Sequence, residues 1–267
     1  MNDGHINCSG SDFRYFSGFT KYTTEIKIYS AAPLRAGAIL QKSFYMTEEA
    51  QITGKKMSKG ARKLMQTAER LFSEHGIDGV SLRQIVTSAG YANSSAIQHH
   101  FGNKEGLLQA VYDMRLPVLE HGRKIRLGWE KKRPNGATLD GLIHAFFMPL
   151  VEDFDEKTQA TYQQFNTRLL QSELHPHPYL NSRVAQPAAY EILELISTFL
   201  PQLTIQVYNV RVRLASELFL SAMAERRRLK NLDDDPYTSD SHYWRDVLQA
   251  IQALFSVVTV TEGTPNT

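Results

Sequence analysis

A short stretch of the chain gathers side chains that can both donate and accept hydrogen bonds. Residues 94–100 read Ser-Ser-Ala-Ile-Gln-His-His, which predicts a helix with Ala96 and Ile97 facing inward and the polar side chains exposed. A glutamine amide can bridge N6 and N7 of adenine, and small hydroxyls can pair with either type of base. Gln98, with Ser94 and Ser95 beside it, is therefore suited to reading base edges in a nucleic acid.

The surrounding elements must position this stretch. A helical pattern ends at Gly76, and Ser81 and Gln84 then have the spacing of a capping box that opens a short helix ended by Gly90. Asn103 caps a longer helix after the polar stretch. Two short helices joined by a glycine-containing turn and packed on a longer first helix form a helix-turn-helix unit. In such a unit the second short helix enters the major groove while the first crosses the DNA backbone.

The distribution of charge fits a polyanionic partner for this part of the chain. Residues 55–133 carry a net charge of +8, residues 134–267 carry −6, and residues 1–54 are neutral. Such asymmetry predicts that the middle segment meets a polyanion. Solvated helix faces are the alternative explanation on charge alone.

Composition excludes several other classes of protein. The length of 267 residues predicts two modest domains, and the single cysteine, Cys8, excludes an intrachain disulfide or a multi-cysteine zinc module. No stretch approaches the ~18 consecutive apolar residues of a membrane-spanning helix. We therefore expect a cytoplasmic protein without a membrane segment and without a cofactor.

Three helical segments together resemble the N-terminal domain of TetR-type transcriptional repressors. They read Leu64-Met-Gln-Thr-Ala-Glu-Arg-Leu-Phe-Ser-Glu-His-Gly76, then Val80-Ser-Leu-Arg-Gln-Ile85 with Ala89-Gly90, and Ala96-Ile-Gln-His-His-Phe-Gly-Asn-Lys-Glu-Gly-Leu-Leu108. The resemblance implies an all-α homodimer with an N-terminal three-helix DNA-binding domain and a larger C-terminal helical domain for ligand binding and dimerisation. We place the DNA-binding domain at 58–119, the effector and dimerisation domain at 120–260, and a tail at 261–267. Residues 1–57 are expected to be a disordered extension, or the result of a start assigned too far upstream.

The resemblance also implies which side chains meet DNA. Asn93 would start the recognition helix, the groove-facing side chains would be Ser94, Ser95, Gln98 and His99, and those near phosphates would be Arg83, His100 and Lys104. There are alternatives for each group. Ser94 and Ser95 could act only as helix caps, His100 could be a core histidine, and Arg83 and Lys104 could lie on a solvated face. The chain has one residue more than the common pattern before His100, and Gln98 stands where an aromatic residue is usual, so no operator sequence follows from relatives.

The remainder of the chain predicts further helices over 139–154, 162–174, 188–200 and 207–229 and a final helix from Trp244 onward. The last two are apolar over more of their surface than one subunit easily covers. Similar helices form the dimer interface of TetR-type repressors, which implies an interface of Leu214, Leu218, Phe219, Trp244, Leu248, Ile251 and Phe255. Packing within one chain is the alternative.

An effector pocket between these helices is expected to take an apolar or aromatic ligand. The candidate lining residues are Phe146, Phe147, Phe154, Tyr162, Phe165 and Arg168, with Arg168 as a possible partner for an anion. Ordinary core is the alternative role for each of them. Glu173, His175 and His177 lie among prolines, which favours a loop over a metal site.

These patterns predict a transcriptional repressor that binds a palindromic operator as a homodimer. A small-molecule effector would release it by moving the long helix after Asn103. There are two alternatives. The acidic C-terminal domain could be an enzyme, or the chain could be a dimeric interaction protein with a vestigial DNA-binding domain. The sequence contains no G-x-S-x-G elbow, phosphate-binding glycine loop or H-E-x-x-H site, so no enzymatic activity is expected.

Overall fold

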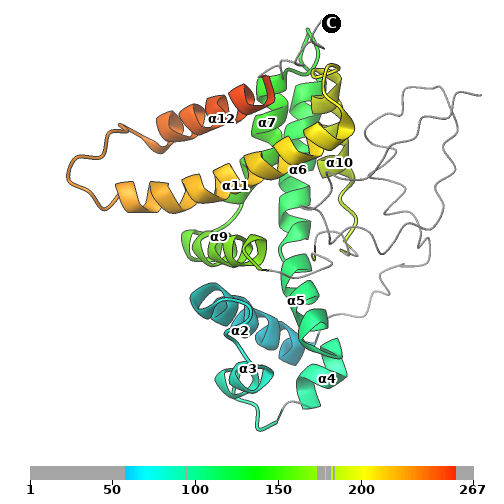
Figure 1. Cartoon of the computed structure of the whole chain (residues 1–267), viewed down its shortest axis with the longest axis vertical. Helices are drawn as coiled ribbons and strands as arrows, with labels where there is room; N and C mark the ends of the chain where they lie inside the picture. The colour runs from blue at the N-terminus through cyan, green and yellow to red at the C-terminus, as the bar shows by residue number, and fades with distance from the viewer. Residues whose placement is uncertain (1–57, 94, 173–177, 179–181, 183, 257–267) are drawn as a thin grey trace, which may run out of the picture. The chain divides into compact units, whose positions relative to one another are not determined.

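Helices make up the regular structure of this protein. The computed structural model describes residues 58–93, 95–172, 178, 182 and 184–256, all within one compact unit, Arg35–Thr267, and those residues form helices and no strand (Figure 1). The extension at 1–57, the tail at 261–267 and the loop with His175 and His177 lie outside the described residues. None of the described helices is long and apolar enough to cross a membrane.

The first four described helices pack around a common core. They are α2 (Lys59–His75), α3 (Leu82–Ser88), α4 (Ser95–Phe101) and α5 (Lys104–Asp113). Leu64 and Phe72 of α2, Ile85 of α3, Ile97 of α4 and Leu107 of α5 are all fully buried in it. This arrangement confirms the expected helix-turn-helix unit on a longer first helix.

Local signals fix the ends of these helices. The Ser81 side chain accepts from the Gln84 amide, and the Gln84 side chain accepts from the Ser81 amide at 2.7 Å, so the predicted capping box is present. Asn103 caps α5 by accepting from the amide of Gly106 at 2.8 Å. Gly76 ends α2 with a φ of 78°, a left-handed conformation that glycine adopts without a steric penalty.

In the described part of the chain, seven more helices follow and surround a second core. They are α6 (Leu116–Lys131), α7 (Leu139–Phe147), α8 (Pro149–Glu152), α9 (Glu156–Leu170), α10 (Pro187–Thr198), α11 (Ile205–Leu229) and α12 (Asp240–Ser256). The single helix expected over 139–154 is wrong, because α7 ends before Pro149 and the short α8 begins there. Proline cannot donate the backbone hydrogen bond that would continue a helix.

The long helix expected after Asn103 is divided into α5 and α6. Pro117 stands in the first turn of α6, and its ring removes a helical hydrogen bond and crowds the preceding turn. Met114 and Arg115 separate the two helices and keep αR conformations; we call this two-residue interruption the bend between α5 and α6. The expectation of one continuous lever is therefore wrong, and the bend divides it.

Helix α9 belongs to both cores. Phe165 and Leu169 are buried in the core of α2–α5, whereas Tyr162, one turn earlier, is buried in the second core. The rings of Phe165 and Phe72 lie 6.4 Å apart. The division of the chain at residue 119 stays a prediction, but α9 ties the two parts together.

A buried ion pair adds a second tie at the bend. The Glu69 side chain is 2% exposed on α2, and both its carboxylate oxygens accept from Arg115, from Nε at 3.0 Å and from Nη2 at 2.6 Å. This two-bond geometry orients the guanidinium as well as attracting it. Glu69 and Arg115 therefore hold the bend between α5 and α6 against the first helix.

Candidate nucleic-acid interface and effector cavity

Helix α4 has one buried side and one exposed polar side. Ile97 is fully buried and Ala96 partly so, while Gln98, His99 and His100 are exposed. The inward and outward directions predicted for this helix are confirmed. The alternative of His100 as a core histidine is wrong, since its ring lies in solvent beside the ring of His99, 4.8 Å away.

The start of α4 is held by a local hydrogen-bonded turn. The amide of Ser95 donates to Asn93 Oδ1 at 3.2 Å, and the Ser95 hydroxyl donates to the same oxygen. Side-chain turns of this kind fix the entry into a helix. The side chain that caps the start of α4 is therefore Asn93, and Ser95 is its hydrogen-bond donor. Ser94 lies outside the described residues.

Two of the cations expected near phosphates differ in their surroundings. Arg83 is exposed on α3. Lys104 is partly buried, and its ammonium lies 5.9 Å from the centre of the Phe72 ring, within the range of a cation–π contact. Lys104 must therefore change rotamer before it reaches a phosphate, whereas Arg83 is already directed to solvent.

A third cation, not predicted from the sequence, lies near the turn between α3 and α4. Lys63 is exposed on α2, and its ammonium lies 6.0 Å from the centre of the Tyr91 ring, which belongs to that turn. The Tyr91 hydroxyl in turn lies so close to Gly60 that a Cβ there would be 2.9 Å from it. The first turns of α2 thus pack directly beside the turn, and the cluster Lys59, Arg62 and Lys63 in the sequence was the available signal.

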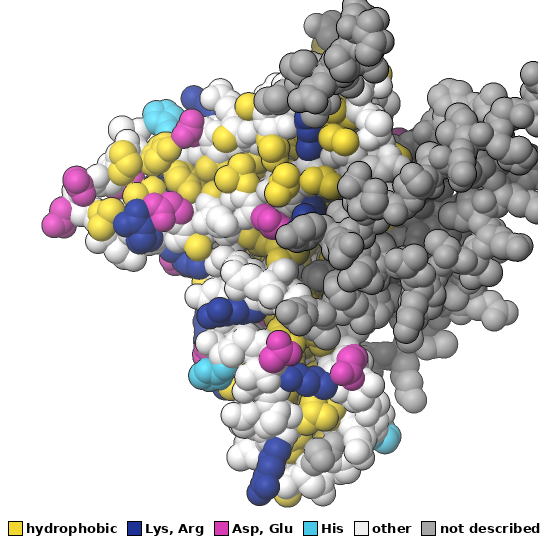
Figure 2. Space-filling view, in the orientation of Figure 1, with side chains coloured by type: hydrophobic (Ala, Val, Ile, Leu, Met, Phe, Trp, Pro, Cys, Tyr) yellow, Lys and Arg dark blue, Asp and Glu magenta, His cyan; other side chains and the backbone are white. Residues whose placement is uncertain are grey.

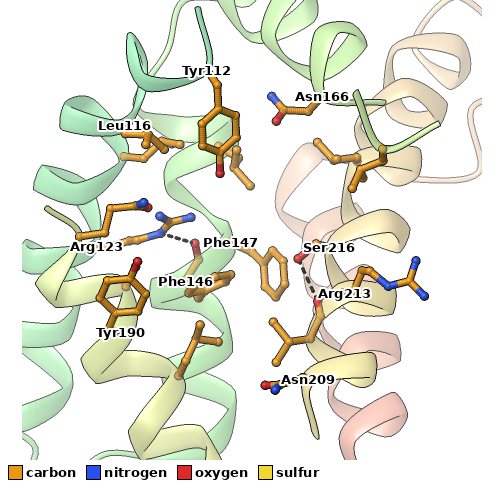
Figure 3. A pocket seen from close by; sticks show the side chains of 18 of the residues that line it. Tyr112, Leu116, Arg123, Phe146, Phe147, Asn166, Tyr190, Asn209, Arg213 and Ser216 are labelled. Carbon is orange, nitrogen blue, oxygen red and sulfur yellow. Dashed lines mark hydrogen bonds between the residues drawn. The ribbon is translucent and has the colours of Figure 1, made fainter. Parts of the chain in front are cut away.

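The second core encloses a cavity of about 420 Å³. Helices α5, α6, α7, α8, α9, α10 and α11 contribute to its walls (Figure 3). Most of the lining is aliphatic or aromatic. The apolar side chains include Leu116, Leu119, Phe147, Leu150, Leu193 and Leu220, and the polar ones include Tyr112, Arg123, Asn166, Tyr190 and Ser216.

Half of the residues predicted for this pocket line it. Phe146, Phe147 and Tyr162 do. The assignment of the other three is wrong: Phe165 is buried in the other core, Phe154 packs against Tyr162 with ring centres 5.6 Å apart, and Arg168 is exposed. Arg168 lines a separate open hollow with Gln163 and Arg227.

The buried cation of the cavity is Arg123, which the sequence analysis missed. Its side chain is 6% exposed, Nε donates to the backbone oxygen of Phe146 at 3.1 Å, and the guanidinium carbon lies 4.4 Å from the centre of the Phe146 ring. Burial lowers the pKa of Arg123 from its ordinary value. The only signal in the sequence was an arginine on the otherwise apolar side of α6.

Phenol groups supply the other polar atoms near Arg123. In Figure 3, Arg123, Tyr112 and Tyr190 extend toward the same space from one side, and Asn166 and Ser216 stand on the opposite side. Burial raises the pKa of Tyr112 well above its ordinary value, and it raises the pKa of Tyr162 and of Tyr190 to about 12 each. These hydroxyls therefore stay protonated at neutral pH and remain able to donate hydrogen bonds.

The predicted dimer surface needs a correction. Phe219, Leu248, Ile251 and Phe255 are 0–5% exposed and belong to the chain's own core, so their assignment to an interface is wrong. Trp244 is partly buried, with its ring 5.3 Å from that of Phe219.

The exposed apolar side chains of α11 lie on a different stripe. Val210, Leu214 and Leu218 are 48%, 39% and 40% exposed, and their spacing of four residues places them along one side of the helix. Hydrophobic side chains gather over α11 and α12 on the face that Figure 2 shows. We call Val210, Leu214 and Leu218 the α11 stripe.

The match to known proteins is concentrated in the helix-turn-helix unit. Residues 64–111 match the model of the bacterial regulatory proteins of the tetR family. The chain is 37% identical over 59 residues to the HTH-type transcriptional repressor AcnR of Corynebacterium efficiens and 36% identical over 58 residues to that of Corynebacterium glutamicum. These matches cover 22% of this chain, and the chain spans only about a third of each relative (31% and 30%).

Solved structures resemble the chain over a longer part of its length. The structure of a TetR-family regulator from a Rhodococcus species aligns with 75% of this chain and over 100% of its own length, at 17% identity and a TM-score of 0.45. PfmR of Thermus thermophilus, also a TetR-family regulator, covers 76% of this chain at 15% identity with a TM-score of 0.44, and 99% of it is covered. Over residues 64–111, this chain is therefore similar to the bacterial regulatory proteins of the tetR family.

Proposed function

We propose that the protein is a transcriptional repressor that binds a palindromic operator as a homodimer and leaves it when a small molecule binds. The observation that carries this proposal is α4, whose polar side chains face solvent while Ile97 anchors it in a helix-turn-helix core. A cytoplasmic location and the lack of enzymatic activity belong to the same proposal.

In this proposal α4 enters the major groove. Gln98 and His99 are exposed on it and can approach base edges, and an amide such as that of Gln98 is suited to adenine. Arg83 and Lys63 are exposed on neighbouring helices and would meet the phosphates on either side, with Lys104 joining them after a rotamer change.

Two copies would join through the α11 stripe. Its three side chains keep large apolar areas in solvent in the single chain, and a twofold partner would cover them with its own copy of the stripe. A symmetric dimer places two recognition helices at a fixed separation, which is what a palindromic site requires.

The bend between α5 and α6 connects the cavity to the DNA-binding helices. Tyr112 precedes the bend, Leu116 follows it, and both line the cavity. A ligand that binds more tightly at one bend angle would shift the population toward that angle and move α4 through α5. A ligand with equal affinity for both angles would release no DNA.

The test is binding of the purified protein to fragments of its own genome, including the region upstream of its gene. We expect fluorescence anisotropy to show salt-dependent, tight binding to at least one fragment, weakened in Gln98→Ala. Gln171→Ala, an exposed glutamine outside the helix-turn-helix unit, is the matched control and should bind normally. Tight binding to no genomic fragment would overturn the proposal.

A further inference from the structure

The cavity contains a buried cation that makes no salt bridge to the described residues. Arginine keeps its proton under all ordinary conditions, so Arg123 is charged although it is 6% exposed. No carboxylate among the described residues lies within 4.0 Å of its guanidinium, although salt bridges of that length form elsewhere in the chain. A buried charge without a partner costs free energy, so the arrangement is unfavourable unless something else pairs with it.

The acidic group whose charge acts on Arg123 is engaged elsewhere. Glu120, one turn earlier on α6, accepts from the amides of Ala188 and Ala189 in the first turn of α10, the latter at 3.3 Å. It therefore fills the role of an anion at a helix N-terminus. Burial raises the pKa of Glu120, opposed by those amide hydrogen bonds.

A second arginine at the wall of the cavity already has a partner. Arg213 is exposed on α11, and its Nη1 lies 3.0 Å from a carboxylate oxygen of Glu217. In Figure 3 its guanidinium points away from the space that Arg123 faces. Arg123 is therefore the cation that a ligand inside the cavity would meet.

The remaining bonding capacity of Arg123 is open to a ligand. Nε is used by the Phe146 oxygen, and the guanidinium makes no other hydrogen bond to the described residues. A guanidinium has five N–H donors in a planar fork that matches the two oxygens of a carboxylate. In Figure 3 the phenol groups of Tyr112 and Tyr190 stand on the same side of the cavity as Arg123.

We propose that the effector is an amphiphilic monoanion, a carboxylate on an apolar or aromatic body, with its carboxylate on Arg123. The body would lie against Leu119, Phe147 and Leu220. The cavity of about 420 Å³ is in the usual range for small-molecule sites. The proposal that this ligand releases DNA rests on the proposed function, whereas its binding does not.

The charge balance favours one negative charge over two. A single carboxylate can pair with Arg123, because the carboxylate of Glu120, whose charge also acts on Arg123, is hydrogen-bonded to the first turn of α10. A phosphate dianion would bring a second charge without a partner, and burying it is costly. An uncharged ligand of the same shape would leave the arginine without a partner.

The test uses acids paired with their own primary amides, because the two differ mainly in charge. The probes are octanoate, decanoate, 4-phenylbutanoate and 2-naphthoate, each with its amide, and the full-length protein is followed by thermal shift and calorimetry. We expect at least one acid of the panel to bind about tenfold or more tightly than its amide, as a charge-assisted hydrogen bond predicts. Amides that bind as tightly as the acids, or no binding of any acid at about 1 mM, the weak end of measurable affinities, would overturn the proposal.

Substitutions then assign the effect to Arg123. Arg123→Met should abolish the preference for acids and leave the unfolding temperature of the ligand-free protein unchanged or higher, because it replaces a buried unpaired charge with an apolar side chain. Arg168→Met, an exposed arginine outside the cavity, is the matched control and should keep the preference. An acid preference that survives Arg123→Met would remove Arg123 from the site.

A DNA-binding measurement separates this proposal from the preceding one. If the acids bind to the protein and no genomic fragment does, the proposed ligand class is supported and the proposed repressor function is refuted. If a genomic fragment binds tightly, but only the amides bind in the cavity or no probe binds there, the proposed repressor function is supported and the proposed ligand class is refuted.

Discussion

Truncating the α11 stripe should weaken the dimer, and the chain supplies a matched control. Leu218 on α11 and Ile125 on α6 are both 40% exposed and have the same number of side-chain carbons. Leu218→Ala and Ile125→Ala therefore remove similar exposed apolar areas at different sites. Only the first should change the association of two copies.

The magnitude follows from the exposed fraction. Burying a leucine side chain completely contributes roughly 2 kcal/mol, so covering the remaining 40% of Leu218 contributes about 0.8 kcal/mol. A twofold interface contains this side chain twice, so most of about 1.6 kcal/mol is lost, which is roughly a tenfold rise in the dissociation constant. Leu214 is 39% exposed, and the double variant should reach roughly a hundredfold.

Sedimentation equilibrium of the two single variants and the double variant measures these constants directly. Affinity for an operator should fall in parallel, since a monomer engages one half-site. Equal weakening by Ile125→Ala would place the interface on α6, and a wild-type protein that stays monomeric at micromolar concentration would refute the reasoning.

Three further predictions concern DNA reading, the bend and acid stability. Gln98→Ala should cost about 1–3 kcal/mol at the cognate site and leave random DNA unaffected, so equal losses on both in a competition assay would remove it from base reading. Glu69→Gln should lower the free energy of unfolding by about 3 kcal/mol because it leaves Arg115 unpaired. A Glu69→Met/Arg115→Met double variant should recover most of that loss in urea unfolding, and no recovery would contradict a pairwise effect. The pKa of Asp240 lies below its usual 3.8, because its hydrogen bonds, first that from Lys230, outweigh the effect of burial. The ionised Asp240 therefore stabilises the fold above pH 3.8, and this contribution is lost as the pH falls through its lowered pKa. In Asp240→Asn the unfolding temperature should fall less steeply on acidification.

Local signals in the sequence predicted the helix-turn-helix unit well. The capping box of Ser81 and Gln84, the Asn103 cap and the end of α2 at Gly76 each involve groups a few residues apart. Such contacts depend on the chain's immediate neighbours, so their spacing alone identifies them.

Features that depend on distant contacts were predicted poorly. Phe165 was predicted to line the effector pocket, yet it completes the core of α2–α5. Arg168 was predicted as the cation of that pocket, yet it is exposed, and the buried Arg123 lines the cavity instead. The pairing of α9 with α2 determines the place of Phe165, and the packing of several helices around one cavity determines which arginine is buried there. Helical periodicity describes which side of a helix is apolar, and it does not tell which partner covers that side.

The sharing of α9 between the two cores limits where this chain can be divided. Phe165 and Leu169 fill space next to Phe72, so a fragment cut at residue 119 would lose two of the side chains that complete its interior. A chimera that joins helices α2–α5 to another C-terminal domain would have to include α9, or replace Phe165 and Leu169 with side chains that fill the same space. Helices α2–α5 and the helices of the second core are therefore expected to be exchanged together, and not separately, between proteins.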